Sequence, residues 1–164
     1  MTDLNDMHPL IVHFPIVLLI IHAVAALLWV IRKKDLFLTL SLIFILAGVI
    51  TGVTAVLTGN LSAQETIKIM EGREKSETDK QIKEVIEEHE DAATLLLWFY
   101  SVLGAAYLIT WIKKVLRKDD SAITGLRMWL LVLLSAAGIL LLVYTGWHGG
   151  ELVYKYGVGT GLFK

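Results

Sequence analysis

Four long apolar runs restrict what this chain can fold into. They cover residues 9–31, 36–60, 91–112 and 124–147. Each run reaches the length of about 20 residues that a helix needs to cross the hydrocarbon core of a bilayer. Hydrophobic residues make up 55% of the 164 residues, which is also typical of a membrane protein. We therefore predict an all-α fold, an integral membrane four-helix bundle that forms one domain over residues 1–164.

The basic residues predict how the bundle is oriented. The two short loops after the first and third runs contain 8 of the 15 Lys and Arg residues: Arg32, Lys33, Lys34, Lys113, Lys114, Arg117, Lys118 and Arg127. The positive-inside rule makes that face cytoplasmic. Both termini then lie on the outer, extracytoplasmic side of a multi-pass protein in the inner membrane.

Two further segments are predicted at the outer face. Loop 61–90 is charged, but its apolar residues recur every three or four positions, which indicates one or two amphipathic helices lying at the surface. The second of these would run through His89 into the third span. We interpret the loop mainly as a solvated connector, with an acidic docking face for a basic periplasmic partner as the alternative. The Gly-rich tail 149–164 is expected to be extended and to fold back over the outer face.

Histidines are the strongest indication of chemistry. The chain has five: His8, His13, His22, His89 and His148. The predicted topology brings all of them except His22 to the outer leaflet, whereas His22 lies roughly 20 Å deep on helical rise. Ionisable side chains in a membrane usually mark a ligand site or a pathway. We therefore treat all five as candidate metal ligands.

Haem b is the cofactor that this set of residues fits best. Cysteine is absent, which excludes iron–sulfur clusters, Cys-ligated zinc and covalent c-type haem. A bis-histidine haem needs two neutral imidazoles, and helices of a bundle can present them across their interface. Our provisional pairing joins His13 or His22 to His89, and His8 to His148, and helix angles alone do not choose between the permutations. The chain would then hold one or two haems, and a remaining histidine could contact a quinone.

Small residues beside the histidines would leave room for a flat macrocycle. Gly52 lies in the second span, and Gly149 and Gly150 follow His148. Close helix packing is the ordinary role of such residues. Tyr154 and Lys155 are predicted to anchor the tail at the headgroup level, or to meet anionic groups of the cofactor.

The opening HPLIVHFP, the histidine that begins the third span and the closing GGELVYKYGVG together resemble the four-helix membrane family known as domain of unknown function 2231. The resemblance covers nearly the whole chain. Its members occur fused to c-type cytochrome or Rieske-type modules, which implies a role in electron transfer with such partners. By position, His8, Pro9, His13 and Pro15 match the opening, His89 the third-helix site, and Gly149, Gly150, Tyr154 and Gly157 the closing motif.

We therefore predict a cytochrome b-like electron-transfer protein in the lipid bilayer. A homodimer is compatible with the sequence, and two alternative functions stay open. The histidines and outer carboxylates could bind or transport a divalent metal ion. The chain could also be a noncatalytic assembly subunit whose histidines only cap helix ends. No paired nucleophile and base indicates an enzyme with its own substrate, although quinol oxidation stays open. No feature points to nucleic acid.

Overall fold

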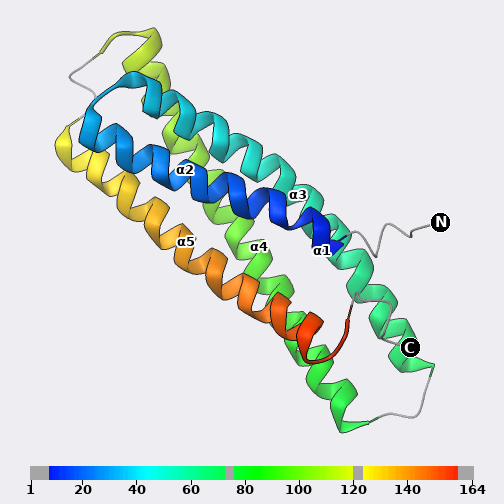
Figure 1. The fold of residues 1–164 in the computed structure, drawn as a ribbon. Coiled ribbons are helices and arrows are strands. Elements are labelled where there is room, and N and C mark those ends of the chain that lie inside the picture. The colour runs from blue at the N-terminus through cyan, green and yellow to red at the C-terminus, as the bar shows by residue number, and fades with distance from the viewer. Residues whose placement is uncertain (1–7, 73–75, 120–123, 159–164) are drawn as a thin grey trace.

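The computed structural model describes residues 8–72, 76–119 and 124–158, and all regular structure in these ranges is helical (Figure 1). A short helix α1 (His8–Ile11) leads into α2 (His13–Arg32), and α3 (Asp35–Glu71) runs back beside it. Helix α4 (Glu77–Trp111) continues into a π-helix η2 (Ile112–Leu116), and α5 (Gly125–Tyr154) completes the bundle. Four helical segments are long and apolar enough to cross a membrane, which confirms the predicted fold class.

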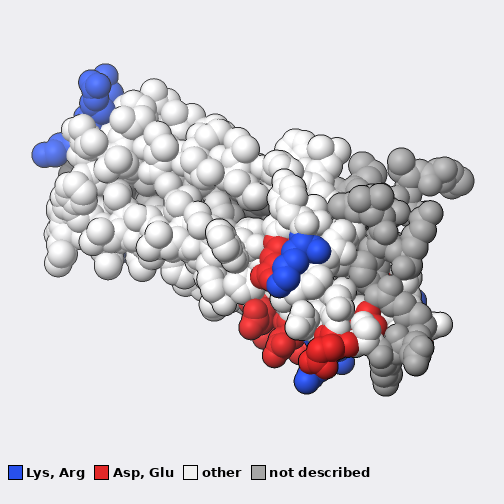
Figure 2. All heavy atoms as spheres, turned by 60° about the horizontal axis from the view of Figure 1, so that its bottom comes forward, with Lys and Arg blue, Asp and Glu red and all other residues white. Residues whose placement is uncertain are grey.

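The outer surface of the bundle suits lipid rather than water. Large apolar side chains stand exposed along it, including Ile50, Leu133 and Leu140, which are 64–73% exposed. A soluble monomer rarely exposes so much contiguous apolar surface. Figure 2 shows a long stretch of this surface without charged side chains, bounded by Lys and Arg at one end and by mostly acidic residues at the other.

Helices α3 and α4 are longer than the predicted spans. At about 1.5 Å per residue, the 37 residues of α3 extend well beyond a hydrocarbon core of about 30 Å. Loop 61–90 therefore consists mainly of continuations of the two spanning helices. The predicted helix that runs through His89 into the third span is present in α4, whereas the segment after the second span continues α3 and does not form a separate helix. Ser76 begins α4 with a capping box, in which its hydroxyl accepts from the Asp79 N–H and the Asp79 carboxylate accepts from the Ser76 N–H.

A second apolar core explains why these extensions stay together. It is separate from the main core of the spans and consists of Ala63, Met70, Ile82, Ile86, Leu152 and Val158. The C-terminal segment contributes to it because Gly157 adopts a positive φ of 71°, which turns the chain back. The Val158 N–H then donates to the Leu152 carbonyl at 2.9 Å. The tail is thus helical up to Tyr154, and the extended form predicted for all of 149–164 is wrong for 149–154; residues 159–164 lie outside the described ranges.

The break between α1 and α2 follows from Pro15. A proline removes its own N–H and its ring crowds the carbonyl four residues earlier, which here belongs to Ile11. Helix α1 ends at that residue. The short helix therefore leaves the axis of α2, and it carries His8 toward the inside of the bundle.

The bundle has two chemically distinct ends. The end that holds α1 and the C-terminus of α5 is called the histidine end here. The end that holds the turn between α2 and α3, together with η2, is called the basic end. Both described chain ends lie at the histidine end (Figure 1).

Candidate functional site

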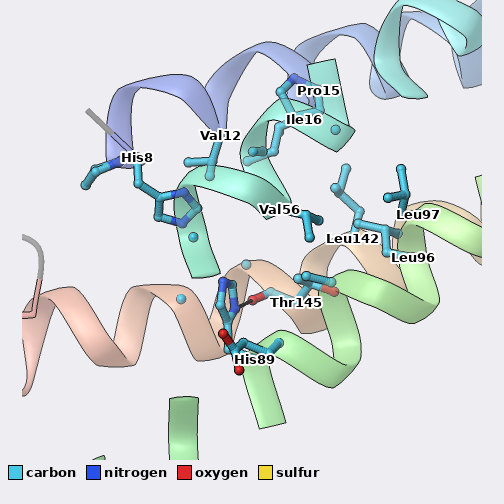
Figure 3. A pocket seen from close by; sticks show the side chains of 18 of the residues that line it. His8, Val12, Pro15, Ile16, Val56, His89, Leu96, Leu97, Leu142 and Thr145 are labelled. Carbon is cyan, nitrogen blue, oxygen red and sulfur yellow. Dashed lines mark hydrogen bonds between the residues drawn. The ribbon is translucent and has the colours of Figure 1, made fainter. Parts of the chain in front are cut away.

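A cavity of about 360 Å³ lies inside the bundle at the histidine end. Its walls come from α1, α2, α3, α4 and α5, and most of them are aliphatic. Figure 3 shows two imidazoles, from His8 and His89, facing each other from opposite sides of this cavity. Cavities of this size and character are typical sites for small ligands and cofactors.

His8 is oriented by helix α3. Its Nδ1 lies 3.1 Å from the Thr58 hydroxyl oxygen. That hydroxyl directs its own hydrogen to the carbonyls of Thr54 and Ala55, at 3.0 and 3.1 Å. The Thr58 oxygen therefore accepts from His8, which places the ring proton on Nδ1. The lone pair of His8 is left on Nε2.

His89 is oriented in the same way by helix α5. Its Nδ1 lies 3.0 Å from the Thr145 carbonyl oxygen. A carbonyl can only accept, so Nδ1 carries the proton here as well. The dashed line in Figure 3 marks this bond. Both imidazoles thus have the tautomer in which Nε2 can bind a metal.

The two rings lie close together at a steep angle. Their centroids are 6.5 Å apart and their planes are inclined by 75°. Each ring rests on a glycine: a Cβ added to Gly59 would come within 3.0 Å of His8 Cε1, and one added to Gly149 within 2.9 Å of His89 Cε1. Glycine at both positions is therefore needed for the rings to sit where they do.

The structure corrects the predicted pairing of histidines. We expected His13 or His22 beside His89, and His8 beside His148; His8 lies beside His89 instead. His22 is fully buried in the middle of the bundle, where its Nδ1 donates to the Ser41 carbonyl at 3.0 Å. Its Nε2 lies 3.1 Å from the Ser135 hydroxyl. Both ring nitrogens of His22 are occupied, so no metal ligand is offered there.

His148 and His13 also lie outside the pair. His148 Nε2 is 3.2 Å from a Glu88 carboxylate oxygen, and Nδ1 is 3.2 Å from the Tyr144 carbonyl. The contact with Glu88 connects α5 to α4 next to the pair, whereas the contact with Tyr144 lies within α5. His13 is exposed and touches only the rim of the cavity. The structure therefore unites two of the five predicted ligands and separates the other three.

Of the five other residues predicted to contact the cofactor, four line the cavity and Lys155 does not. Gly52, Gly149, Gly150 and Tyr154 line the cavity, although the Tyr154 side chain is 93% exposed. Lys155 is exposed and its ammonium lies 2.7 Å from the Glu151 carboxylate. That hydrogen bond is the main reason why the pKa of Lys155 is raised above its usual range.

The residues that orient the pair were not assigned a role from the sequence. Thr58 and Thr145 are each followed by glycine at the outer end of a span, as LTGN and YTGW. The Thr-Gly pair alone is not a specific signal, because it occurs five times in the chain; its place at the outer end of a span is what these two share. Tyr100 was also missed: it lines the cavity with 1% of its surface exposed, and its hydroxyl, packed against Gly138, has no hydrogen-bond partner.

The chemistry of the site is set by its donors. The imidazoles of His8 and His89 face each other there, His13 and Glu90 also line the cavity, and no group of three His, Cys, Asp or Glu side chains suited to a metal ion occurs among the residues that the structure describes. Structural zinc sites use four protein ligands and catalytic ones usually three. A pair of imidazoles on its own suits a metal whose other ligands belong to a macrocycle.

Comparison with known proteins identifies the family. Residues 5–161 match the family described as "Predicted membrane protein (DUF2231)". The match covers nearly the whole chain, so the chain belongs to this family, as the motifs at its two ends predicted. Neither a curated protein nor a solved structure matches it.

Proposed function

We propose that this member of the DUF2231 family is a membrane cytochrome that binds one haem b between His8 and His89 and transfers electrons. One observation carries the proposal. Each imidazole has its Nδ1–H fixed by a hydrogen bond from a neighbouring helix, which leaves both Nε2 lone pairs at the same cavity. Metal-binding histidines are commonly oriented by such a bond through the other ring nitrogen.

The separation of the rings supports this assignment. A metal–imidazole bond is about 2 Å long, so two imidazoles on opposite sides of one ion have centroids about 6 Å apart. The centroids of His8 and His89 are 6.5 Å apart. The observed centroid separation is therefore close to the one that two imidazoles on a single iron would have.

The walls of the cavity also suit a porphyrin. They are mainly aliphatic, and Gly59 and Gly149 keep the space beside the rings free of side-chain atoms. Burial of the apolar ring system would contribute most of the binding free energy, since apolar surface contributes roughly 25 cal/mol per Å² removed from water. The two histidines would add specificity for the iron.

The geometry favours one haem rather than two. His22 and His148 have both ring nitrogens engaged by other groups, and His13, which also lines the cavity, is exposed. A divalent-metal site is less well supported, because two nitrogens are fewer ligands than such an ion usually takes from protein.

Haem b supplies reversible one-electron transfer. His8 and His89 would hold the haem, with their rings oriented by Thr58 and Thr145, and the apolar walls would limit access of water, which is one influence on the potential. From the positive-inside rule we expect the histidine end to face the extracytoplasmic side of the membrane. There a c-type cytochrome or Rieske-type module would exchange electrons with it, and a quinone in the bilayer is the candidate partner from the lipid side.

The test is the haem content of the full chain, purified in detergent after expression with added haem precursor. A pyridine haemochrome assay should give one haem b per chain, and the reduced-minus-oxidised spectrum should show a sharp α-band. A colourless protein that is folded and monodisperse contradicts the proposal. Two haems per chain would retain the function but overturn the assignment of a single pair.

A further inference from the structure

The basic end of the bundle carries a dense group of cations. Eight basic residues belong to it: Arg32, Lys33, Lys34, Lys113, Lys114, Arg117, Lys118 and Arg127. The acidic residues among the described positions of this end are Asp35 and Asp119. In Figure 2, blue side chains stand at this end of the molecule, separated from the acidic residues by the uncharged belt.

The two basic segments are held next to each other. The Trp111 indole N–H, at the end of α4, donates to the Thr39 hydroxyl near the start of α3 at 2.9 Å. The turn between α2 and α3 and the π-helix η2 therefore lie at the same end of the bundle, as Figure 1 shows. Their cations face one leaflet of the membrane.

The backbone of this end is unusual. Lys33 and Lys118 have φ of 52° and 51°, and they are the non-glycine residues with positive φ in the described chain. That conformation is unfavourable for any residue with a Cβ, and glycine would avoid the cost. Just before Lys118, residues Ile112–Leu116 form the π-helix η2, a rare type of helix, in which the Arg117 N–H donates to the Ile112 carbonyl at 3.0 Å. Lysine at two positions that favour glycine indicates that its side chain has a role.

Apolar side chains stand exposed beside the cations. Ile31 and Leu36 flank the turn after α2, and Leu116 precedes Arg117; their exposed fractions are 59%, 61% and 63%. A ligand with an anionic head and an apolar body would contact both kinds of group at once. A soluble anion or a water-soluble protein would leave the apolar residues unused.

We propose that the basic end is a binding site for anionic phospholipids, with the phosphate headgroup held by the cations that include Lys33 and Lys118, and the acyl chains against Ile31, Leu36 and Leu116. Basic groups at a membrane surface attract anionic lipids, and pockets between helices can select their headgroups. This proposal does not depend on the presence of haem. It would attach the bundle to anionic lipid in the leaflet predicted to be cytoplasmic.

Native mass spectrometry of the full chain tests it, with dioleoyl phosphatidylglycerol and dioleoyl phosphatidylcholine titrated separately into the detergent-solubilised protein. The wild type should bind phosphatidylglycerol more tightly than phosphatidylcholine. The double variant K33G/K118G should lose affinity for it by about 5-fold per lysine, as expected for a cation at a membrane surface. Its melting temperature should be unchanged or higher, because glycine relieves the backbone.

Three controls make the result specific. K33R/K118R keeps both charges and should retain the affinity. K80Q/K83Q removes two exposed lysines from the opposite end of α4 and should also retain it. K33N/K118N should repeat the loss, since asparagine tolerates this backbone conformation. Equal retention of the two lipids by the wild type, an unchanged affinity in both neutral variants, or an equal loss in K80Q/K83Q would overturn the proposal.

Discussion

His8 and His89 lie 81 positions apart in the chain, yet their ring centroids are 6.5 Å apart, and each presents the same nitrogen to one cavity. The arrangement on the two sides is parallel. On each side a histidine donates through Nδ1 to a threonine of another helix, the Thr58 hydroxyl for His8 and the Thr145 carbonyl for His89, and a glycine lies against its ring. Two helical hairpins therefore build matching halves of one site.

The glycines under the rings should be essential for binding. Changing Gly59 or Gly149 to alanine would place a Cβ 3.0 or 2.9 Å from an imidazole carbon and push the ring away. We expect each variant to lose haem affinity by at least about tenfold, while stability changes by no more than about 1 kcal/mol, because alanine favours a helix. Haem titration followed by absorbance measures the effect. Gly146→Ala is the matched control: it lines the same cavity with nothing within 4 Å, and it should bind as the wild type does.

Thr58 should control the angle between the rings. A low-spin ferric haem with nearly perpendicular axial planes gives an EPR spectrum with one large g value, whereas parallel planes give a rhombic spectrum. With planes inclined by 75°, the wild type should belong to the first type. Thr58→Val removes the hydroxyl acceptor of the His8 N–H and leaves the Ala55 carbonyl as its partner, so the ring should turn, the spectrum should shift toward the rhombic form and the midpoint potential should change. Thr58→Ser should restore the wild-type spectrum; identical spectra for all three proteins would show that Thr58 does not position the ring.

His22 should matter for stability and not for haem. Its ring joins α2 to Ser41 of α3 and Ser135 of α5, and Tyr107 bonds the same Ser135 hydroxyl at 3.1 Å. Replacement by leucine leaves these buried polar groups without their partner, at a cost of about 1–3 kcal/mol. Thermal unfolding in detergent should show a lower melting temperature, with the haem content per folded chain unchanged. Loss of haem from a chain that is still folded would restore His22 as a ligand.

The turn at Gly157 should seal the mouth of the cavity. Its φ of 71° positions Val158, which both lines the cavity and packs in the second core. Gly157→Val forces a branched residue into this conformation, at a cost of about 1–2 kcal/mol. We expect faster haem loss to a scavenging apoprotein, with the absorption spectrum retained. Gly157→Asn should show a smaller increase, and equal rates in all three proteins would exclude this role for the turn.

Length and hydropathy predicted the helices correctly, because a bilayer imposes a minimum apolar length on each span. They could not predict that α3 and α4 continue past the membrane. That depends on contacts of Met70, Ile82 and Ile86 with Leu152 and Val158, which are far away in the sequence. The histidines were identified as candidates from their positions at span ends. Which of them meet depended on the break at Pro15 and on the rotation of each helix about its axis, which spacing along one helix does not define.

The same limit explains why His22 was predicted to be a ligand. An ionisable residue at membrane depth indicated a ligand by default. Its partners Ser41 and Ser135 lie on two other helices, and no pattern in the sequence connects them with it. The Thr-Gly pairs were visible, but their importance follows only from their contact with the imidazoles.

The most direct test of the account is the optical spectrum of four single variants purified side by side: His8→Ala, His89→Ala, His13→Ala and His148→Ala. The first two should lose the low-spin α-band, and imidazole added to the buffer should restore it by entering the space left beside the iron. The last two should keep the spectrum and one haem per chain. A low-spin spectrum that survives the loss of His8 or His89, or that disappears with His13 or His148, would contradict the assignment of the pair.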